Sequence, residues 1–428
     1  MEVAILVIAF IILIGLGVPI AWSIGLSSIF TMLVSIPALP AFTTVAHRMA
    51  TGLDSFSLLA IPFFVLAGQI MNRGGIARRL IAFARTLVGS LPGGLAHVNI
   101  MAAMMFGAIA GSAVAAASAI GSFMTDEMEK EGYSTEFAAA VNITSSTTGM
   151  VIPPSNILIV YSLASGGVSI AALFLAGYVP GILTGLLLMI VAGVMSKKKG
   201  MKVGKRSSLR QVWSTFWAAF PSLLLLVVII GGIVGGIFTA TEASAVAVLY
   251  CLILTYIYKE VSLDALPDIF LSSVGTTAIV MLLIGTSMSM SWVMAYENIP
   301  QNITTFLLGI SNSKFVILLI INLTLLFVGI FMDMTPAVLI FTPIFLPVVT
   351  ALGMDPTHFG IIMVLNLTIG LCTPPVGSVL FVGVGVAGTT IQKVIKPLMP
   401  LFIAMLVALL LITYIPELSL FLPRLFGL

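Results

Sequence analysis

Charged residues are scarce in this sequence. Only 8% of the 428 residues are Asp, Glu, Lys or Arg, whereas a soluble domain carries about a quarter. Hydrophobic residues make up 60%, and the mean hydropathy is +1.22. Apolar runs of about 20 residues recur from end to end, and such runs can cross a bilayer as helices. The sequence therefore predicts a polytopic membrane protein. We expect the first apolar run to be a retained span, because it lacks a basic segment and a cleavage site.

Cysteine, histidine and nucleotide-binding motifs are almost missing as well. The two cysteines and three histidines are scattered, which excludes a disulfide framework and a metal site of these side chains. A phosphate-binding loop is excluded because GMKVGKRSS has Lys199 and Arg206 where the motif needs Gly and Ser or Thr. No acid–base or nucleophile–base arrangement falls within the spans. We expect no ATP binding, no enzyme and no nucleic-acid partner, so energy must come from a gradient or another subunit.

The most informative feature that is present is a pair of proline doublets inside apolar segments. GMVIPPSNI occupies residues 149–157 and GLCTPPVGS occupies 370–378, so corresponding prolines lie 221 residues apart. Several glycine pairs share this offset, which indicates an internal duplication. We predict a first repeat at 1–196, a basic cytoplasmic linker at 197–212 and a second repeat at 213–428.

Each repeat is predicted to contain the same order of segments. Three spans are followed by an amphipathic or partly polar stretch, an interrupted apolar region, a span with a proline doublet and a final span. In the first repeat these lie at 3–21, 22–38, 56–72, 74–90, 94–125, 135–165 and 169–195. In the second repeat they lie at 217–237, 239–258, 270–295, 296–313, 315–350, 357–386 and 397–422.

The interrupted regions at 94–125 and 315–350 decide how the repeats are oriented. Each has about 30 residues, too many for one span and few for two, and each has turn-prone residues in its middle. We predict that both are re-entrant helical hairpins. Each repeat then crosses the membrane five times, and the two repeats are inverted relative to each other. Fifteen of the 18 Lys and Arg residues fall on the predicted inner side, which places both termini outside.

Breaks in membrane helices expose backbone groups that must be satisfied by protein or by a polar cavity. Each proline doublet removes amide donors, and the span around it should split into two half-helices. Half-helix ends attract ions, cations at the C-terminal ends and anions at the N-terminal ends. A single Pro-Pro kink would be an ordinary structural feature. Two matched breaks, each downstream of a matched hairpin, favour a binding site near the bilayer midplane.

Hydroxyl and amide side chains gather at the four interruptions. The motif MTPA suggests a helix start with Thr335 as N-cap, and CTPP suggests the same role for Thr373. In the first repeat the polar residues are Ser112, Ser145, Ser146, Thr147, Thr148, Ser155 and Asn156. Asn142, Asn156 and Asn366 either serve a hydroxylated ligand or simply bond helix carbonyls.

The choice of coupling ion and substrate follows from the near absence of deep carboxylates. Asp333 is the main acidic candidate, and it is either a helix cap or an ion ligand. Hydroxyls and free carbonyls suit Na⁺ better than H⁺, because proton coupling needs an ionisable group. Converging half-helix starts without compensating acids suit an anionic substrate. A channel or a non-transporting assembly subunit is the alternative to a carrier.

Three long motifs resemble one known family. GIFMDMTPAVLIFTPIFLPVVTALGMDPTHFGIIMVLNLTIGLCTPPVGSVLFV, DSFSLLAIPFFVLAGQIMNRGGIARRL and GMVIPPSNILIVYSLASGGVSIAALFLAGYVPG are similar to the large membrane subunit (DctM type) of tripartite ATP-independent periplasmic (TRAP) transporters. The resemblance covers essentially the whole chain. It implies an elevator-type, Na⁺-driven importer of organic acids in the bacterial inner membrane, with sialic acid as the expected substrate type and C4-dicarboxylates as the alternative. It also implies a periplasmic substrate-binding protein and a small four-span membrane subunit, expected as a separate polypeptide.

The resemblance further implies where ligands bind. One Na⁺ site is expected at Ser112, Ser145 and Gly149, and a second at Asp333, Thr335, Gly370 and Thr373. The substrate is expected near Pro154, Ser155, Asn156, Pro375 and Gly377.

Overall fold

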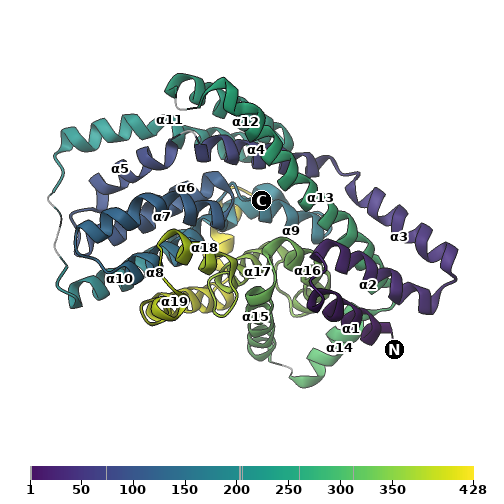
Figure 1. The fold of residues 1–428 in the computed structure, drawn as a ribbon. Coiled ribbons are helices and arrows are strands. Elements are labelled where there is room, and N and C mark those ends of the chain that lie inside the picture. Colours follow the sequence, from purple (N-terminus) through teal and green to yellow (C-terminus); the bar gives the residue numbers. More distant parts are fainter. Residues whose placement is uncertain (1, 74, 202–203, 205, 260, 312) are drawn as a thin grey trace.

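The computed structural model describes residues 2–73, 75–201, 204, 206–259, 261–311 and 313–428 (Figure 1). Throughout these residues the chain forms helices and no strands. Eight helices of this described part are long and apolar enough to cross a bilayer, which confirms the all-α membrane fold. The predicted basic linker at 197–212 falls partly outside the described residues, since 202–203 and 205 are not among them.

The first repeat folds into ten α-helices and two short 3-10 helices in the described residues. They are α1 (Glu2–Gly15), α2 (Ile20–Ser35), α3 (Ala38–Leu53), η1 (Phe56–Leu59), α4 (Ala60–Arg73), α5 (Ile76–Val88), α6 (Gly94–Ala110), α7 (Ala113–Lys130), α8 (Thr135–Ser146), η2 (Thr148–Met150), α9 (Asn156–Ala164) and α10 (Ile170–Lys198).

The second repeat follows the same order. Its elements are α11 (Leu209–Val234), α12 (Ala240–Tyr258), η3 (Leu263–Ala265), α13 (Leu266–Tyr296), α14 (Ile299–Ile310), α15 (Lys314–Phe331), α16 (Met334–Ala351), α17 (Pro356–Gly370), α18 (Ser378–Val386), α19 (Ile391–Tyr414) and α20 (Glu417–Leu425). Helices α7 and α16, α8 and α17, and α10 and α19 each begin 221 residues apart, the offset of the proline doublets.

Three elements differ from the sequence prediction. The predicted first span at 3–21 is shorter in the structure, since α1 ends at Gly15 and α2 already begins at Ile20. Helix α3 occupies 38–53, where no element was predicted, because the segment is amphipathic and too polar to resemble a span. It packs against α13, and the Arg48 guanidinium lies 5.3 Å from the centre of the Trp292 ring. The predicted last span at 397–422 is two helices, α19 and α20, because Pro416 disfavours helical backbone at Ile415 and caps α20.

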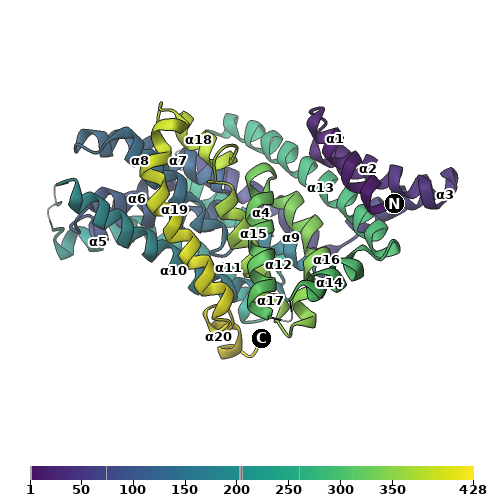
Figure 2. The same cartoon turned by 90° about the horizontal axis from the view of Figure 1, so that it is seen from below.

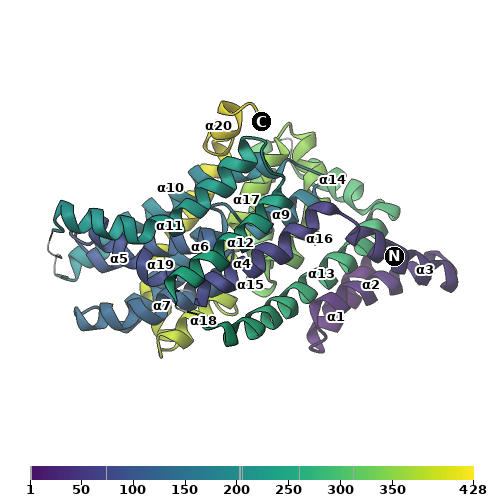
Figure 3. The same cartoon turned by 90° about the horizontal axis from the view of Figure 1, so that it is seen from above.

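Helices α1–α4 and α11–α13, which we call the frame, interlock the two repeats. Helix α2 packs against α13 and α4 packs against α12. In the order of the repeats, α12 corresponds to α2 and α13 corresponds to α4. The contact of α2 with α13 and the contact of α4 with α12 are therefore equivalent, with the roles of the two repeats reversed. Figures 1 and 3 show α1, α2 and α3 beside α13 at one end of the molecule, with α5 and α11 at the other.

Helices α6–α10 and α15–α20 form a second body, which we call the hairpin unit. The helices of each hairpin pack together, α6 on α7 and α15 on α16. The repeats again exchange partners, because α7 packs against α18 while α16 packs against α9, and α8 packs against α19 while α17 packs against α10. Figure 2 shows α19 running beside α10, with α20 at its end. This reciprocal packing places each proline break against the first helix of its own hairpin, with Gly149 beside Gly107 and Gly370 beside Gly329.

The amphipathic segment that follows α4 lies between the two bodies. Helix α5 packs against both α6 and α11. Its Ile76 and Leu80 are buried and Arg78 is exposed, as its periodicity predicts. Arg85 forms ion pairs with Glu127 and Glu131 near the base of the first hairpin, both at 3.0 Å.

Candidate functional site

Both hairpin tips and the first proline break line one cavity of about 260 Å³. The tips contribute Ser112, Asp333 and Thr335, and the start of α9 contributes Asn156. The opposite wall belongs to the frame, where α4 supplies Gln69 and Asn72 and α13 supplies Thr276. The cavity therefore lies between the frame and the hairpin unit, where a relative movement of the two bodies would change its access.

The tips of the two hairpins differ in backbone geometry and in side-chain chemistry, since Gly111 is left-handed and its counterpart Met332 is extended. Ser112 caps α7, and its hydroxyl oxygen accepts a hydrogen bond from the Ala115 amide at 3.2 Å. Gly111 before it has φ +60°, a conformation that glycine adopts without a steric cost. Asp333 lies 221 residues after Ser112 and holds the N-cap position of α16, but its side chain makes no capping hydrogen bond.

Asp333 is the one ionisable side chain among the described residues that line the cavity, and it is exposed to that space. The carboxylate contacts the Met334 amide but makes no capping bond further into α16, so it keeps lone pairs for a cation. The first residues of α7 and α16 also line the cavity, and the N-terminal end of a helix favours an anion. One cavity thus offers both kinds of ligand.

The predicted N-caps of two helices are wrong. Helix α16 begins at Met334 with Asp333 as N-cap, so Thr335 and Pro336 lie inside its first turn. Proline is tolerated there because first-turn amides have no helical acceptor. Helix α18 begins at Ser378 with Gly377 as N-cap, so Thr373 caps nothing. The Thr373 hydroxyl instead donates to the Ile369 carbonyl at 2.9 Å, which closes the end of α17.

Hydroxyl groups at the first break donate their protons to nearby carbonyls. Ser145 and Ser146 donate to the Asn142 carbonyl at 3.2 and 2.6 Å, and Thr148 donates to the Ser145 carbonyl at 2.6 Å. Ser155 donates to the Met150 carbonyl at 2.5 Å and ties the two sides of the loop together. With the protons committed, the oxygen lone pairs are what these side chains can offer to an ion.

Gly149 and Gly370 allow close approach of backbones. A Cβ on Gly149 would lie 2.3 Å from the Cα of Gly107 in α6, and one on Gly370 would lie 2.5 Å from the Cα of Gly329 in α15. Each break is therefore pressed against the first helix of its own hairpin. This contact requires glycine at both positions, independently of any role in ion binding.

The structure brings some predicted site residues together and leaves others apart. Ser112, Asn156, Asp333 and Thr335 line the cavity. The predicted residues outside its lining are Ser145, Gly149, Gly370, Thr373, Pro154, Ser155, Pro375 and Gly377. Asn142 donates to the Ala117 carbonyl at 2.8 Å and Asn366 to the Asn322 carbonyl at 2.9 Å, so both bond helix groups.

The polar wall of the frame was missed by the sequence prediction. Gln69 and Asn72 lie three residues apart in α4 and therefore on one helix face. Two amides on one face of a predicted span were a signal, because polar side chains in lipid are costly. Thr276 gave no comparable signal, since threonine can satisfy itself by bonding its own helix.

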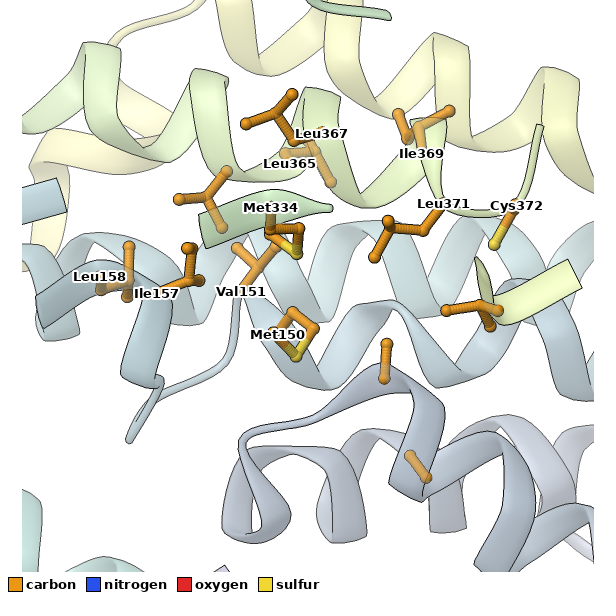
Figure 4. Close-up of a cluster of buried hydrophobic side chains, with 14 of the residues drawn as sticks. Met150, Val151, Ile157, Leu158, Met334, Leu365, Leu367, Ile369, Leu371 and Cys372 are labelled. Carbon is orange, nitrogen blue, oxygen red and sulfur yellow. The ribbon is translucent and has the colours of Figure 1, made fainter. Parts of the chain in front are cut away.

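An apolar cluster closes the space behind the polar groups. Figure 4 shows Met150 and Val151 of the first break together with Met334 of the second hairpin and Leu371 and Cys372 of the second break. All five side chains are buried. This cluster joins the two breaks and the second hairpin tip into one packed unit.

Comparison with known proteins gives one consistent result. The family model described as the tripartite ATP-independent periplasmic transporter, DctM component, matches residues 7–418. The chain is 58% identical to the protein YgiK of Salmonella typhimurium, over 98% of this chain and 96% of that protein. It is 42% identical to the isethionate TRAP transporter permease protein DctMQ of Oleidesulfovibrio alaskensis, over 95% of this chain and 64% of that protein.

A third relative and a solved structure extend the comparison. The chain is 38% identical to the sialic acid TRAP transporter large permease protein of Vibrio cholerae, over 89% of each chain. Its fold is similar to that of the YdaH transporter of Alcanivorax borkumensis, with a TM-score of 0.66, 13% identity and 88% of each chain covered. At that identity the likeness concerns the fold alone.

Proposed function

Because this chain belongs to the DctM family, the large permease component of tripartite ATP-independent periplasmic transporters, we propose that it imports a hydroxylated organic acid in symport with Na⁺. The family consists of transporter permease subunits and not of enzymes. It works with a small membrane subunit and a periplasmic substrate-binding protein. The chain is accordingly a multi-pass membrane subunit of a bacterial TRAP transporter for organic acids.

The cavity between the hairpin tips and the frame carries the substrate proposal. Its polar lining consists of the amides of Gln69, Asn72 and Asn156, three hydroxyls and one carboxylate, without Lys or Arg among the described residues. Helix amides can hold one carboxylate, and side-chain amides and hydroxyls can hold the hydroxyls of a sugar acid. A sugar acid such as sialic acid suits this lining. A C4-dicarboxylate, with two charges, would need more compensation than the lining offers.

Sodium coupling is supported by the oxygen ligands near the cavity. Asp333 offers an uncapped carboxylate, and the Ser112 and Ser145 hydroxyls offer lone pairs. Moving a monoanion into a negative interior costs about 2.3 kcal/mol per 100 mV. Symport of at least two Na⁺ makes the cycle net positive, so the potential drives it. Proton coupling through Asp333 is the alternative hypothesis.

Movement of the hairpin unit against the frame is the proposed elevator step. In support, the two bodies meet asymmetrically, because α4 packs against α6 of the first hairpin while its counterpart α13 packs against α16 of the second. In an inverted-repeat carrier such asymmetry marks one state of the cycle, and exchanged contacts give the opposite state.

We place the chain in the bacterial inner membrane with both termini in the periplasm, where the binding protein would deliver the acid. The small subunit is proposed to be a separate four-span polypeptide that binds the frame. The excess of Lys and Arg on the predicted inner side supports the orientation.

Uptake into proteoliposomes tests the proposed function. With the small subunit and the binding protein supplied, an inward Na⁺ gradient should drive saturable uptake of labelled sialic acid. A panel of sugar acids, C4-dicarboxylates and isethionate identifies the substrate. Counterflow distinguishes a carrier from a channel. Uptake driven by a proton gradient with Na⁺ absent would overturn the coupling, and uptake of dicarboxylates alone would overturn the substrate class.

A further inference from the structure

A second cavity, of about 640 Å³, lies where the ends of three helices of the hairpin unit meet. Lys199 follows the end of α10, Ser134 and Glu136 belong to the start of α8, and Lys393 and Lys396 lie in the first two turns of α19. Three cations and one carboxylate give its lining a net charge of +2. The cavity is remote from the transport site, because these residues lie at the opposite end of α8 from the first break.

The three lysines are available to a ligand. All three are exposed, and none forms an ion pair with a described residue. The Lys199 ammonium lies 5.0 Å from the centre of the buried Phe137 ring, which holds it over the first turn of α8. At the start of α19, the N-cap Thr390 makes no side-chain capping bond, so the first amides of this helix add to the positive potential.

The two helices that supply the lysines also carry apolar surface suited to lipid chains. Exposed side chains of α10 recur every four residues at Ile182, Leu186, Ile190 and Val194, and so lie along one face that ends one turn before the lysines. Helix α19 carries Met399, Ile403 and Val407 in the same way. A cationic cavity at the predicted inner membrane surface, with apolar faces running from it toward the bilayer centre, matches the form of an anionic phospholipid.

The positive-inside rule alone would also place lysines at this end of the helices. The inverted repeat offers a comparison. At the corresponding positions of the other repeat, 221 residues away, Lys393 and Lys396 are replaced by Ala172 and Leu175, and Lys199 by Leu420. The general rule explains this difference in charge between the two ends. It does not require three lysines from two distant segments to enclose one cavity.

We propose that this cavity, between Lys199, Lys393 and Lys396, binds the phosphate headgroup of an anionic phospholipid such as cardiolipin. The two phosphates of cardiolipin match the net charge of the lining. The bound lipid lies on the hairpin unit and not on the frame, so it would move with the unit or leave during each cycle. The proposal does not depend on the identity of the transported acid.

Native mass spectrometry of the purified full chain tests the proposal without any transport assay. Cardiolipin should remain bound at concentrations where phosphatidylcholine does not. Lys393→Gln with Lys396→Gln should weaken cardiolipin binding by about tenfold or more, since each lysine contributes about 1 kcal/mol near an anionic lipid. The matched control, Lys197→Gln with Lys198→Gln, removes two neighbouring inner charges that do not line the cavity and should weaken binding several times less than the cavity pair does.

Two further experiments test whether the bound phosphate belongs to a lipid or to a soluble anion, and whether the lysine charge is what binds it. Inorganic phosphate in millimolar excess should not displace cardiolipin, and displacement would overturn the proposal in favour of a soluble anion. Lys393→Arg with Lys396→Arg should retain binding, which separates loss of charge from loss of fold. If the glutamine pair lacks a melting transition, the single Lys199→Gln variant replaces it. Equal loss of lipid in the cavity pair and the control pair would overturn the site.

Discussion

The two proline breaks share a motif but lie in different surroundings. In the first break Pro154 is buried and Ser155 has only 1% of its surface exposed. In the second break Pro375 is exposed and Val376 has 40% of its surface exposed. Ser155 and Val376 lie 221 residues apart and thus hold the same position in the two repeats. Both repeats therefore contain the break, but neighbouring residues bury the first break and leave the second one exposed.

The cause lies in the helix beside each break. Gly177 and Gly181 of α10 let that helix press on the first break, because a Cβ there would lie 2.2 Å from the Val151 carbonyl oxygen and 2.3 Å from the Ile152 side chain. The corresponding residues of α19 are Leu398 and Phe402, whose larger side chains hold a helix farther away. This difference lies within the hairpin unit and follows from the residue types at these two pairs of positions.

A second asymmetry has a different origin. The frame meets the first hairpin through α6 of that hairpin and the second through α16. At the frame contact Gly68 lies so close to the first tip that a Cβ would be 2.8 Å from the Ala110 carbonyl oxygen. We expect movement of the hairpin unit to change its contacts with the frame and to leave the burial of each proline break unchanged.

The largest expected contrast is in cysteine accessibility. Val376→Cys should react readily with a water-soluble thiol reagent, and Ser155→Cys should stay protected with and without Na⁺ and substrate, because α10 moves with the first break. The native Cys251 and Cys372 are buried, so the unsubstituted chain gives a low background. Reaction of Ser155→Cys during transport would show that the unit reorganises internally. Protection at both positions throughout the cycle would remove the breaks from any aqueous pathway.

The next contrast concerns the part of the two repeats that is alike. Gly149→Ala and Gly370→Ala should each lower thermal stability and uptake, because each Cβ would meet the backbone of the facing hairpin helix. Overpacking of this kind costs about 1–3 kcal/mol. The melting temperature of the purified chain is the measurement. Gly231→Ala is the matched control, since its Cβ would enter open space in α11. A loss in only one of the two repeats would contradict the symmetric role.

The hairpin tips allow a contrast in ion binding. Asp333→Asn should raise the Na⁺ concentration for half-maximal uptake by roughly tenfold or more, because hydrogen bonds and contacts to a charged group are worth about 1.5–3 kcal/mol. Fold stability should change little, since the carboxylate makes no N-capping bond and the amide oxygen of the introduced asparagine can still accept from the Met334 amide. An unchanged Na⁺ requirement, measured in proteoliposomes with both partner proteins, would return Asp333 to a structural role.

The comparison also explains which features sequence could predict. Hairpin tips and breaks are marked by local residues such as Gly111, Ser112 and the proline doublets, and the structure places all four interruptions within the predicted segments. Helix α3 and the polar wall of α4 and α13 depend on packing between distant segments. The amphipathic pattern of 38–53 and the two amides of α4 were local signals, but they do not report what those faces pack against. The sequence predicted Thr335 as the N-cap of α16, whereas the structure has Asp333 there. Both residue types cap helices, and only the backbone conformation distinguishes the two positions.

The smallest expected effect separates a hydroxyl that caps a helix from one that also binds an ion. Ser112 caps α7 at the cavity, and Thr239 caps α12 in the frame within a capping box with Glu242. Ser112→Gly keeps most of the capping energy, because glycine costs only a few tenths of a kcal/mol at this position, but it removes the hydroxyl. We expect it to raise the Na⁺ requirement severalfold at nearly unchanged melting temperature. Thr239→Ala should do the reverse and lose about 1 kcal/mol of stability with an unchanged Na⁺ requirement. The same response in both variants would mean that Ser112, like Thr239, only begins a helix.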